Sequence, residues 1–488
     1  MTNITPAQRG VKLSARSDPA IAEHMLAGDL RGLIHCDGSF WQYDGVCWRP
    51  ISSEAIQQLA MSYDQHKVGG RAITLGSARL ASIEHCLRLK AAKPGFFDEQ
   101  PRGINCANGF IKFETGALPT LVPHDPEHRQ RHVLPGAWQP GRLEVLPANS
   151  LLGKLLGGCF RGDTEAAEKI ALLAELAGAV VLGCGTMFKK AVVLLGPIAQ
   201  NGKRQILDLL RGLLPASAIS TIPPGKFGDE PHLVGLIGKL LNASDELGTA
   251  QAITSDAFKA VVTGEPVRGA DKYKPAVDFR PKAQHVFACN RLPNFQSGMD
   301  RGVMRRLVLV QFDRTIPEGE RIADIGQRIA REEADLLLAW AVEGATRLLE
   351  RARFEEPASS REALSEWAYG SDPVQAFIAD CVRPALTVVG EKPARVSSKR
   401  LFEVYELWCA RERRDAGRFT MQINSFVQRV RENLPSGARY LNSNNFRGFE
   451  GLRLIDEGDE RASGSTDEEP RDDDRAHLGR TLEGVRPA

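Results

Sequence analysis

Several common features are missing from the sequence, and each absence narrows what the protein can be. The nine cysteines are scattered between Cys36 and Cys409 and form no CxxC pair. This spacing argues against zinc sites and predicts reduced, mostly buried thiols in a cytoplasmic setting. The first twenty residues contain no apolar core, so we expect no signal peptide. The longest apolar run, 170–188, is interrupted by Glu175 and three glycines, which favours a buried helix and turn over a membrane span.

The chain also lacks a large charge of one sign. It contains 63 Lys and Arg against 61 Asp and Glu, which leaves a net charge of +2. The overall charge therefore does not require an anionic partner, and any nucleic-acid surface must come from local basic clusters. With 488 residues, 42% of them hydrophobic, the chain can build about two to four domains with real cores.

Composition and periodicity predict five segments. They are a flexible arm (1–30), a mixed α+β domain (31–150), a helical segment followed by an α/β domain (151–355), a module of three helices and two strands (356–456), and a charged, disordered tail (457–488). Within the second segment we expect strands around an Asp44-Gly45 turn, helices at 53–66 and 76–92, and a hairpin near 104–118.

Three histidines in the second segment raise the question of a metal site. His124, His128 and His132 recur every fourth residue, which on a helix would place them on one face. Pro126 interrupts this spacing, and no Cys or acidic third ligand is evident. We therefore expect exposed loop histidines, with a metal site as the alternative.

The third segment contains four short apolar runs. They lie at 191–195, 238–246, 284–290 and 306–312, and a helix is expected at 203–213. Buried runs that alternate with helices predict a parallel α/β sheet. Active groups in such sheets lie at the carboxyl ends of the strands.

The stretch LLGPIAQNGKR, residues 194–204, follows the first of these runs. It resembles a phosphate-binding loop in its Gly196, Asn201, Gly202 and Lys203. However, five residues instead of four separate Gly196 from Gly202, and Arg204 replaces the usual hydroxyl. Since Arg has no acceptor, it cannot ligate a cation, but its guanidinium suits a phosphate. The alternative is an ordinary strand-to-helix turn that needs the freedom of Gly202.

Three further polar groups follow or precede the other runs. Asp245 and Glu246 end the second run, where carboxylates hold Mg²⁺ or activate water. Asn290 ends the third run and is placed to sense a terminal phosphate, while Arg305 and Arg306 precede the fourth run. Taken singly, the acids would be an ordinary strand end and the arginines a solvated basic pair.

The order of these motifs resembles the superfamily 3 helicases of the viral, phage and plasmid primase-helicase family. The similarity is specific in KLLNASDELG, in FKAVVTGEPVRGADKYKPAVDFRPKAQHVFACNRLPN and in DRGVMRRLVLVQF, and it covers about residues 31–455. It implies an α/β fold with an AAA+-like P-loop motor, a mixed α+β N-terminal domain and a C-terminal winged-helix-like module. It also implies a hexameric ring that hydrolyses ATP with Mg²⁺ and translocates on single-stranded DNA. The location would then be the cytoplasm of a bacterial host or a virus-infected cell.

Roles follow from the resemblance position by position. Lys203 would be the phosphate-loop lysine, Asp245 and Glu246 the acidic motif with Asp245 on the metal, and Asn290 the sensor. Either Arg305 or Arg306 would be a finger acting on the neighbouring subunit's nucleotide. No primase domain is found, so we expect no primer synthesis.

Two regions are candidates for DNA contact. The basic stretch 264–275 would form a channel hairpin, in which Arg268, Lys272 and Lys274 neutralise phosphates and Tyr273 stacks on a base. In the C-terminal module, Arg429 and Arg431 lie on a helix expected at 421–433, and Arg447 lies in the hairpin after it. A solvated hairpin and a protein-docking surface are the respective alternatives.

The sequence thus predicts an ATP-dependent replicative DNA helicase of a phage, prophage or plasmid. Its expected partners are single-stranded DNA, duplex origin DNA, replication proteins and further copies of itself, with no membrane. The rival hypotheses are a non-hydrolysing DNA-binding scaffold and a ring loader with a degenerate nucleotide site.

Overall fold

The computed structural model divides the chain into two compact units, 1–371 and 372–488. It describes residues 12–141, 143, 145–245, 253–270, 276–295, 300–371, 373–385, 393–411, 421–443 and 445–455. The predicted tail 457–488 lies outside these residues.

A small N-terminal module has its own core. Its elements are α1 (Asp18–Ala27), β1 (Ile34–Cys36), β2 (Ser39–Tyr43), β3 (Trp48–Ile51), α2 (Ser53–Met61), β4 (Lys67–Val68), β5 (Arg71–Ala72) and α3 (Ser77–Lys90). Residues 18–27 were expected in a loose arm. They form a helix instead, because Ser17 caps its first turn and Ile21, Ala22 and Met25 are buried against the module's core. The expected strands around Asp44-Gly45 are β2 and β3, and β1 pairs with β2 as a third strand.

The next strands belong to the central body of the unit. They are β6 (Gly103–Cys106), β7 (Gly109–Lys112) and β8 (Thr120–Val122), which form the expected hairpin plus one more strand. Ile104, Ile111 and Trp138 of this region are buried in the same core as the central sheet.

The centre of the unit is a five-stranded parallel sheet, as the four apolar runs predicted. Its order is β10 (Ile219–Ser220), β11 (Leu241–Ser244), β14 (Gln284–Cys289), β9 (Ala191–Leu195), β15 (Leu307–Gln311). Sequence reasoning missed β10, since two residues carry no periodicity. β14 and β15 flank β9 and run parallel to it, so their carboxyl ends lie beside the loop that follows β9.

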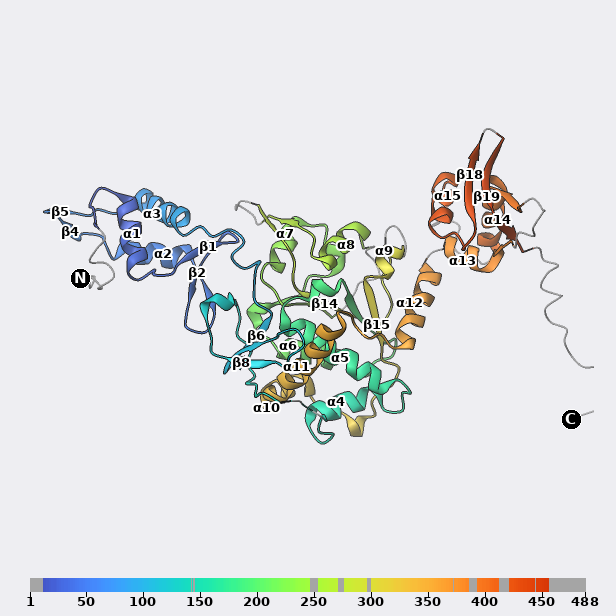
Figure 1. Cartoon of the computed structure of the whole chain (residues 1–488), viewed down its shortest axis with the longest axis horizontal. Coiled ribbons are helices and arrows are strands. Elements are labelled where there is room, and N and C mark those ends of the chain that lie inside the picture. The colour runs from blue at the N-terminus through green and yellow to red at the C-terminus, as the bar shows by residue number, and fades with distance from the viewer. Residues whose placement is uncertain are drawn as a thin grey trace, which may run out of the picture. The chain divides into compact units, whose positions relative to one another are not determined.

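Helices cover both faces of this sheet. One face packs on α4 (Leu151–Phe160), α5 (Ala166–Leu182), α6 (Lys203–Gly212), α10 (Ile325–Glu332) and α11 (Ala334–Arg351). The other packs on α7 (Glu230–Leu233), α8 (Ser255–Thr263), α9 (Arg301–Met304) and α12 (Ala358–Ser371). Alternate residues face the two layers, with Val192 and Leu194 in one core and Ala191 and Val193 in the other. Figure 1 shows α8 and α9 on one side of β14 and β15, and α5 and α11 on the other.

Glycines let α5 and α11 approach closely. A Cβ added to Gly344 would lie 1.8 Å from the Ala174 carbonyl oxygen, and one on Gly178 would lie 2.3 Å from the Ala345 nitrogen. The apolar run 170–188 is thus a buried helix, ended by Gly183 at φ 62°, and a following turn. In the part of the chain that is described, no helix is long and apolar enough to cross a membrane.

The C-terminal unit has a separate core. It contains α13 (Pro373–Cys381), β16 (Val382–Pro384), β17 (Arg395–Ser397), α14 (Ser398–Arg411), α15 (Ile423–Glu432), β18 (Arg439–Ser443), β19 (Phe446–Glu450) and β20 (Leu452–Leu454). The three expected helices are present, and β18 and β19 are the expected terminal hairpin. The short strands β16, β17 and β20 were not expected.

Candidate nucleotide-binding site

The loop between β9 and α6 is fixed by the neighbouring strands on both sides. The Gly196 amide donates to the Cys289 carbonyl at 3.2 Å, and the Phe312 amide donates to the Leu195 carbonyl at 2.8 Å. Further along, the Ile316 amide donates to the Gln200 carbonyl at 3.0 Å. The loop therefore lies at the carboxyl edge of the sheet, where α/β proteins bind ligands.

Both glycines of the loop are required by its geometry. Gly202 has φ 91°, and an added Cβ would lie 2.3 Å from Cys159 Sγ. A Cβ on Gly196 would lie 2.1 Å from Asn201 Nδ2 and 3.0 Å from Lys203 Nζ. The glycines thus let the backbone turn sharply into α6 while Lys203 folds back over Gly196.

Lys203 is buried and points into this fold of the loop. Its Nζ donates to the Gly196 carbonyl and, at 2.9 Å, to Asn290 Oδ1. Desolvation lowers the pKa of Lys203. Burial raises the pKa of the neighbouring Cys289 thiol to about 12, so this cysteine stays neutral. The structure therefore brings together Gly196, Lys203 and Asn290, which the sequence assigned to one site.

Asn201 lines the same cleft as Lys203, and its side-chain amide bonds to the protein backbone. Its Nδ2 donates to the Ile198 carbonyl at 2.8 Å and to the Phe312 carbonyl at 3.2 Å. These bonds hold the loop in shape, so its amide already has partners within the protein.

The predicted acidic residue Asp245 pairs with Arg211, a residue that the sequence analysis did not assign to the site. Asp245 directly follows β11, and its Oδ1 accepts a hydrogen bond from Arg211 in the last turn of α6. Arg211 also donates to the Ala243 carbonyl at 3.2 Å and to Asp208 Oδ1 at 3.3 Å. The spacing of Arg204, Asp208 and Arg211, four and three residues apart, places them on one helix face and was the available signal. Glu246 lies outside the described residues.

A cleft of about 670 Å³ joins these groups. Among the charged residues that line it are three cations, Lys203, Arg204 and Arg291, and one carboxylate, Asp245. Arg204 is exposed in this cleft. Within the described ranges, no group of three His, Cys, Asp or Glu side chains is arranged to hold a metal ion.

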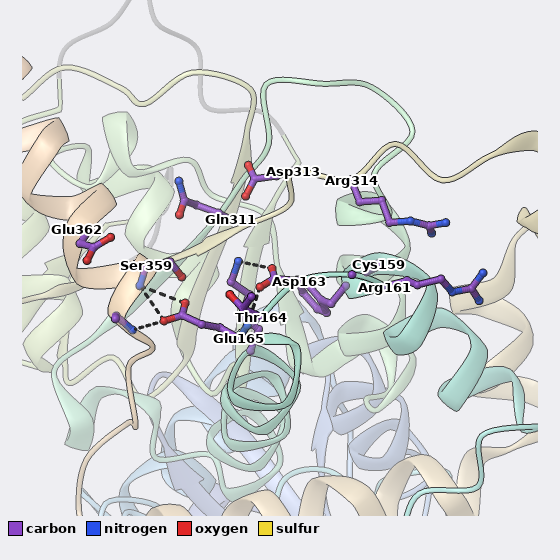
Figure 2. A pocket seen from close by; sticks show the side chains of 14 residues that line it. Cys159, Arg161, Asp163, Thr164, Glu165, Gln311, Asp313, Arg314, Ser359 and Glu362 are labelled. Carbon is purple, nitrogen blue, oxygen red and sulfur yellow. Dashed lines mark hydrogen bonds and ion pairs between the residues drawn. The ribbon is translucent and has the colours of Figure 1, made fainter.

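A second cleft of about 570 Å³ lies at the carboxyl end of β15 and is lined by Gln311, Asp313 and Arg314 among others. Its charged lining is mixed, with the Asp163–Lys169 ion pair at 2.7 Å and with Glu165 accepting from the Ala358 and Ser359 amides at the start of α12. Figure 2 shows Glu165 directed at Ser359, while Arg161 and Arg314 extend from the opposite side. Its lining contains four carboxylates and three cations, whereas the first cleft contains three cations and one carboxylate.

The predicted finger arginines lie at the amino-terminal ends of the parallel strands, opposite the end that carries the loop. Leu307 pairs with Ala191 and Gln311 with Leu195, so Arg305 and Arg306 precede the amino end of β15. Five residues of strand, roughly 15 Å, separate them from the loop. Arg305 is exposed, and Arg306 Nη1 donates to the Gly302 carbonyl at 2.7 Å. Neither belongs to the loop's own cleft.

The first predicted DNA-contacting region is described only in part. Arg268 is exposed on β12 (Val267–Gly269), opposite Asp278 of β13 (Val277–Phe279). Lys272, Tyr273 and Lys274 lie between these strands, outside the described residues.

In the C-terminal unit, two of the predicted residues meet at Tyr440. The Arg431 guanidinium lies 4.8 Å from the Tyr440 ring centre, and Arg447 Nε donates to the Tyr440 hydroxyl at 3.2 Å. These residues line a groove of about 620 Å³ together with Asn424 and Gln428. Arg429 does not line it.

The three histidines, the alternative metal site of the sequence analysis, form no metal-binding group in the described part of the chain. His124 Nδ1 lies 2.8 Å from Asn105 Oδ1, His128 stacks on Phe110, and His132 Nε2 donates to the Gly238 carbonyl at 2.8 Å. All three are half-buried, so the expected exposure is wrong, although His124 and His132 do lie in loops. Each histidine instead packs against a different part of the unit.

Two segments of the chain match known families. Residues 20–159 match the family "D5 N terminal like", and residues 194–306 match a family of unknown function, DUF5906. No curated protein matches the chain significantly. Among solved structures, the A-form apo structure of the NrS-1 C-terminal region is 12% identical, with a TM-score of 0.45 over 74% of this chain and 78% of that chain. A second A-form structure of the same region is 13% identical, with a TM-score of 0.43 over the same shares.

Proposed function

We propose that the protein is an ATP-driven DNA helicase of phage, prophage or plasmid replication. The observation that carries this proposal is Lys203, buried at the start of α6 and held by Asn290 at the carboxyl edge of the sheet. A phosphate loop needs a lysine in this place, behind a buried strand and at a helix N-terminus. The match of residues 20–159 to the D5 N-terminal-like family agrees with the primase-helicase resemblance of the motifs.

In this proposal ATP binds with its phosphates along the loop. Lys203 leaves the Gly196 carbonyl and donates to the terminal phosphates, while Asn290 contacts the terminal phosphate from β14. Magnesium, when present, supplies charge stabilisation and would enter on the phosphate oxygens. Asp245 is the described carboxylate that would face it, but Arg211 already occupies Asp245 Oδ1. These donors alone do not make a metal site.

We further propose that the chain works as a ring, with six subunits as the expected number. Arg305 and Arg306 lie at the edge opposite the loop, so they suit a neighbouring subunit's nucleotide better than their own. The β12–β13 hairpin with Arg268 would contact single-stranded DNA, and the groove at Arg431 and Arg447 would contact duplex DNA.

Unwinding of a forked DNA substrate with ATP tests the proposal. The wild-type protein should displace the labelled strand only with ATP, and Lys203→Ala should not displace it. Strand displacement by Lys203→Ala at the wild-type rate would reject the phosphate-loop role.

The ring-loader alternative rests on a specific observation as well. Arg204 replaces the metal-ligating hydroxyl, and Arg211 holds Asp245. Both features reduce the ligands left for a metal ion, so in this alternative they weaken hydrolysis without weakening nucleotide binding. Tight ATP binding without turnover or unwinding would favour a nucleotide-switched loader over a helicase.

A further inference from the structure

We propose that the cleft lined by Lys203, Arg204 and Arg291 binds the phosphate chain of a nucleoside triphosphate without help from a divalent cation. The inference rests on the proposed function, since it assumes that the cleft is a nucleotide site. It adds that protein cations do the work that Mg²⁺ does in ordinary phosphate loops.

The charges that line the cleft are mostly positive. Lys203, Arg204 and Arg291 contribute three positive charges, and Asp245 is the described carboxylate against them. The amides at the start of α6 add the partial positive charge of a helix N-terminus. An anion with several negative charges is therefore matched by the protein itself.

Arg204 directly follows the lysine of the loop. In ordinary phosphate loops a hydroxyl at this position ligates the metal. Arg204 has no acceptor atom, but its fork of N–H donors suits phosphate oxygens. Its side chain is exposed and lines the cleft, so it is free to turn toward a bound phosphate. The substitution replaces a metal ligand with a phosphate ligand.

The carboxylate of the cleft, Asp245, is already paired with a cation. Arg211 donates to Asp245 Oδ1 and is itself fixed by the Ala243 carbonyl and by Asp208. A metal ion at Asp245 would have to compete with this guanidinium. Across the described residues, no three-ligand group of acidic, His or Cys side chains is present to assist it.

The test is equilibrium binding of a fluorescent ATP analogue, measured once with Mg²⁺ and once with EDTA at equal ionic strength. We expect the wild-type Kd to change by less than about threefold between the two conditions. Lys203→Ala should lose binding in both, which places the binding in this cleft. Its thermal melting without nucleotide checks that the variant is folded.

Arg204→Ser provides the sharper comparison. It removes the phosphate ligand and restores a hydroxyl, so its Kd in EDTA should rise tenfold or more while Mg²⁺ recovers part of the loss. Arg353→Ser removes the same charge at an exposed position after α11 and should behave like the wild type.

The outcomes separate this inference from the proposed function. If the wild type binds only with Mg²⁺, and Lys203→Ala abolishes that binding, the inference is overturned and the nucleotide site stands. If the wild type binds no nucleotide in either condition, the nucleotide site itself fails. Equal sensitivity of Arg204→Ser and Arg353→Ser to EDTA also overturns the inference.

Discussion

Single residues decide whether the loop can hold phosphate. Lys203 and Asn290 were both recognisable from the sequence, because each stands at the end of an apolar run or the start of a helix. The pairing of Arg211 with Asp245 was not, since it depends on how the last turn of α6 meets the end of β11. A long-range ion pair of this kind leaves only the helical spacing of Arg204 and Arg211 as a trace in the sequence.

Buried histidines predict acid sensitivity of the N-terminal unit. Desolvation lowers the pKa of His132 to about 4, from about 6.5 in the unfolded chain. Between these values the unfolded state binds a proton that the folded state does not, so the free energy of unfolding falls as the pH falls from about 6.5 to about 4. The expected loss is on the order of a few kcal/mol.

Chemical denaturation at several pH values checks this expectation. His132→Gln keeps a donor for the Gly238 carbonyl and should make the dependence between pH 4 and 6.5 less steep, while His285, whose pKa burial also lowers to about 4, keeps part of it. His85→Gln, at an exposed position on α3, is the matched control and should keep the wild-type slope. An unchanged slope in His132→Gln would show that His132 is not the titrating group.

Whole elements were predictable where a continuous apolar run is long enough. The run 191–195 is β9 in full, and 284–290 and 306–312 agree with β14 and β15 to within a residue at each end. The two-residue β10 and the three-residue β16, β17 and β20 were missed, because their pairing partners rather than their own sequences define them. The N-terminal helix α1 was missed as well, because its apolar residues are not confined to one helical face.

The close contact between α5 and α11 should make the stability of the fold sensitive to the size of residue 344. Gly344→Ala would place a Cβ 1.8 Å from the Ala174 carbonyl oxygen, so the helices must separate. We expect a loss of ~1–3 kcal/mol, as for other overpacked cores. Gly157→Ala on the exposed face of α4 has nothing within 4 Å and should be neutral or stabilising, by up to ~1 kcal/mol. Thermal unfolding of both variants compares them, and equal melting temperatures would contradict the close approach.

The basic stretch 264–275 is proposed to bind single-stranded DNA, and its charge can be tested directly. Replacing Lys272 and Lys274 by Ala should weaken single-strand binding and reduce the log–log salt slope by ~0.7 for each lost phosphate contact. Lys67→Ala with Lys154→Ala removes the same charge at exposed positions elsewhere. Fluorescence anisotropy at several salt concentrations measures both slopes. The hairpin has no role in DNA binding if the two double variants have the same slope.

At the level of the whole molecule, the site is one half of a proposed interface. The loop and the predicted finger arginines lie at opposite ends of the parallel strands, which suits the proposed ring, in which each nucleotide is completed by the next subunit. The variant that lacks both Arg305 and Arg306 should therefore assemble but not hydrolyse ATP. Mixing it with Lys203→Ala subunits should recover part of the turnover, because some interfaces then join an intact loop to intact arginines. Activity in the arginine variant alone would contradict a role across the interface.

The most direct test of a nucleotide-driven motor is ATP turnover with and without single-stranded DNA, in the wild type and in Lys203→Ala. We predict that the wild type hydrolyses ATP, that single-stranded DNA stimulates this turnover, and that Lys203→Ala shows neither activity while keeping the wild-type melting temperature. Turnover in Lys203→Ala equal to the wild type, or no turnover by the wild type under either condition, would contradict it.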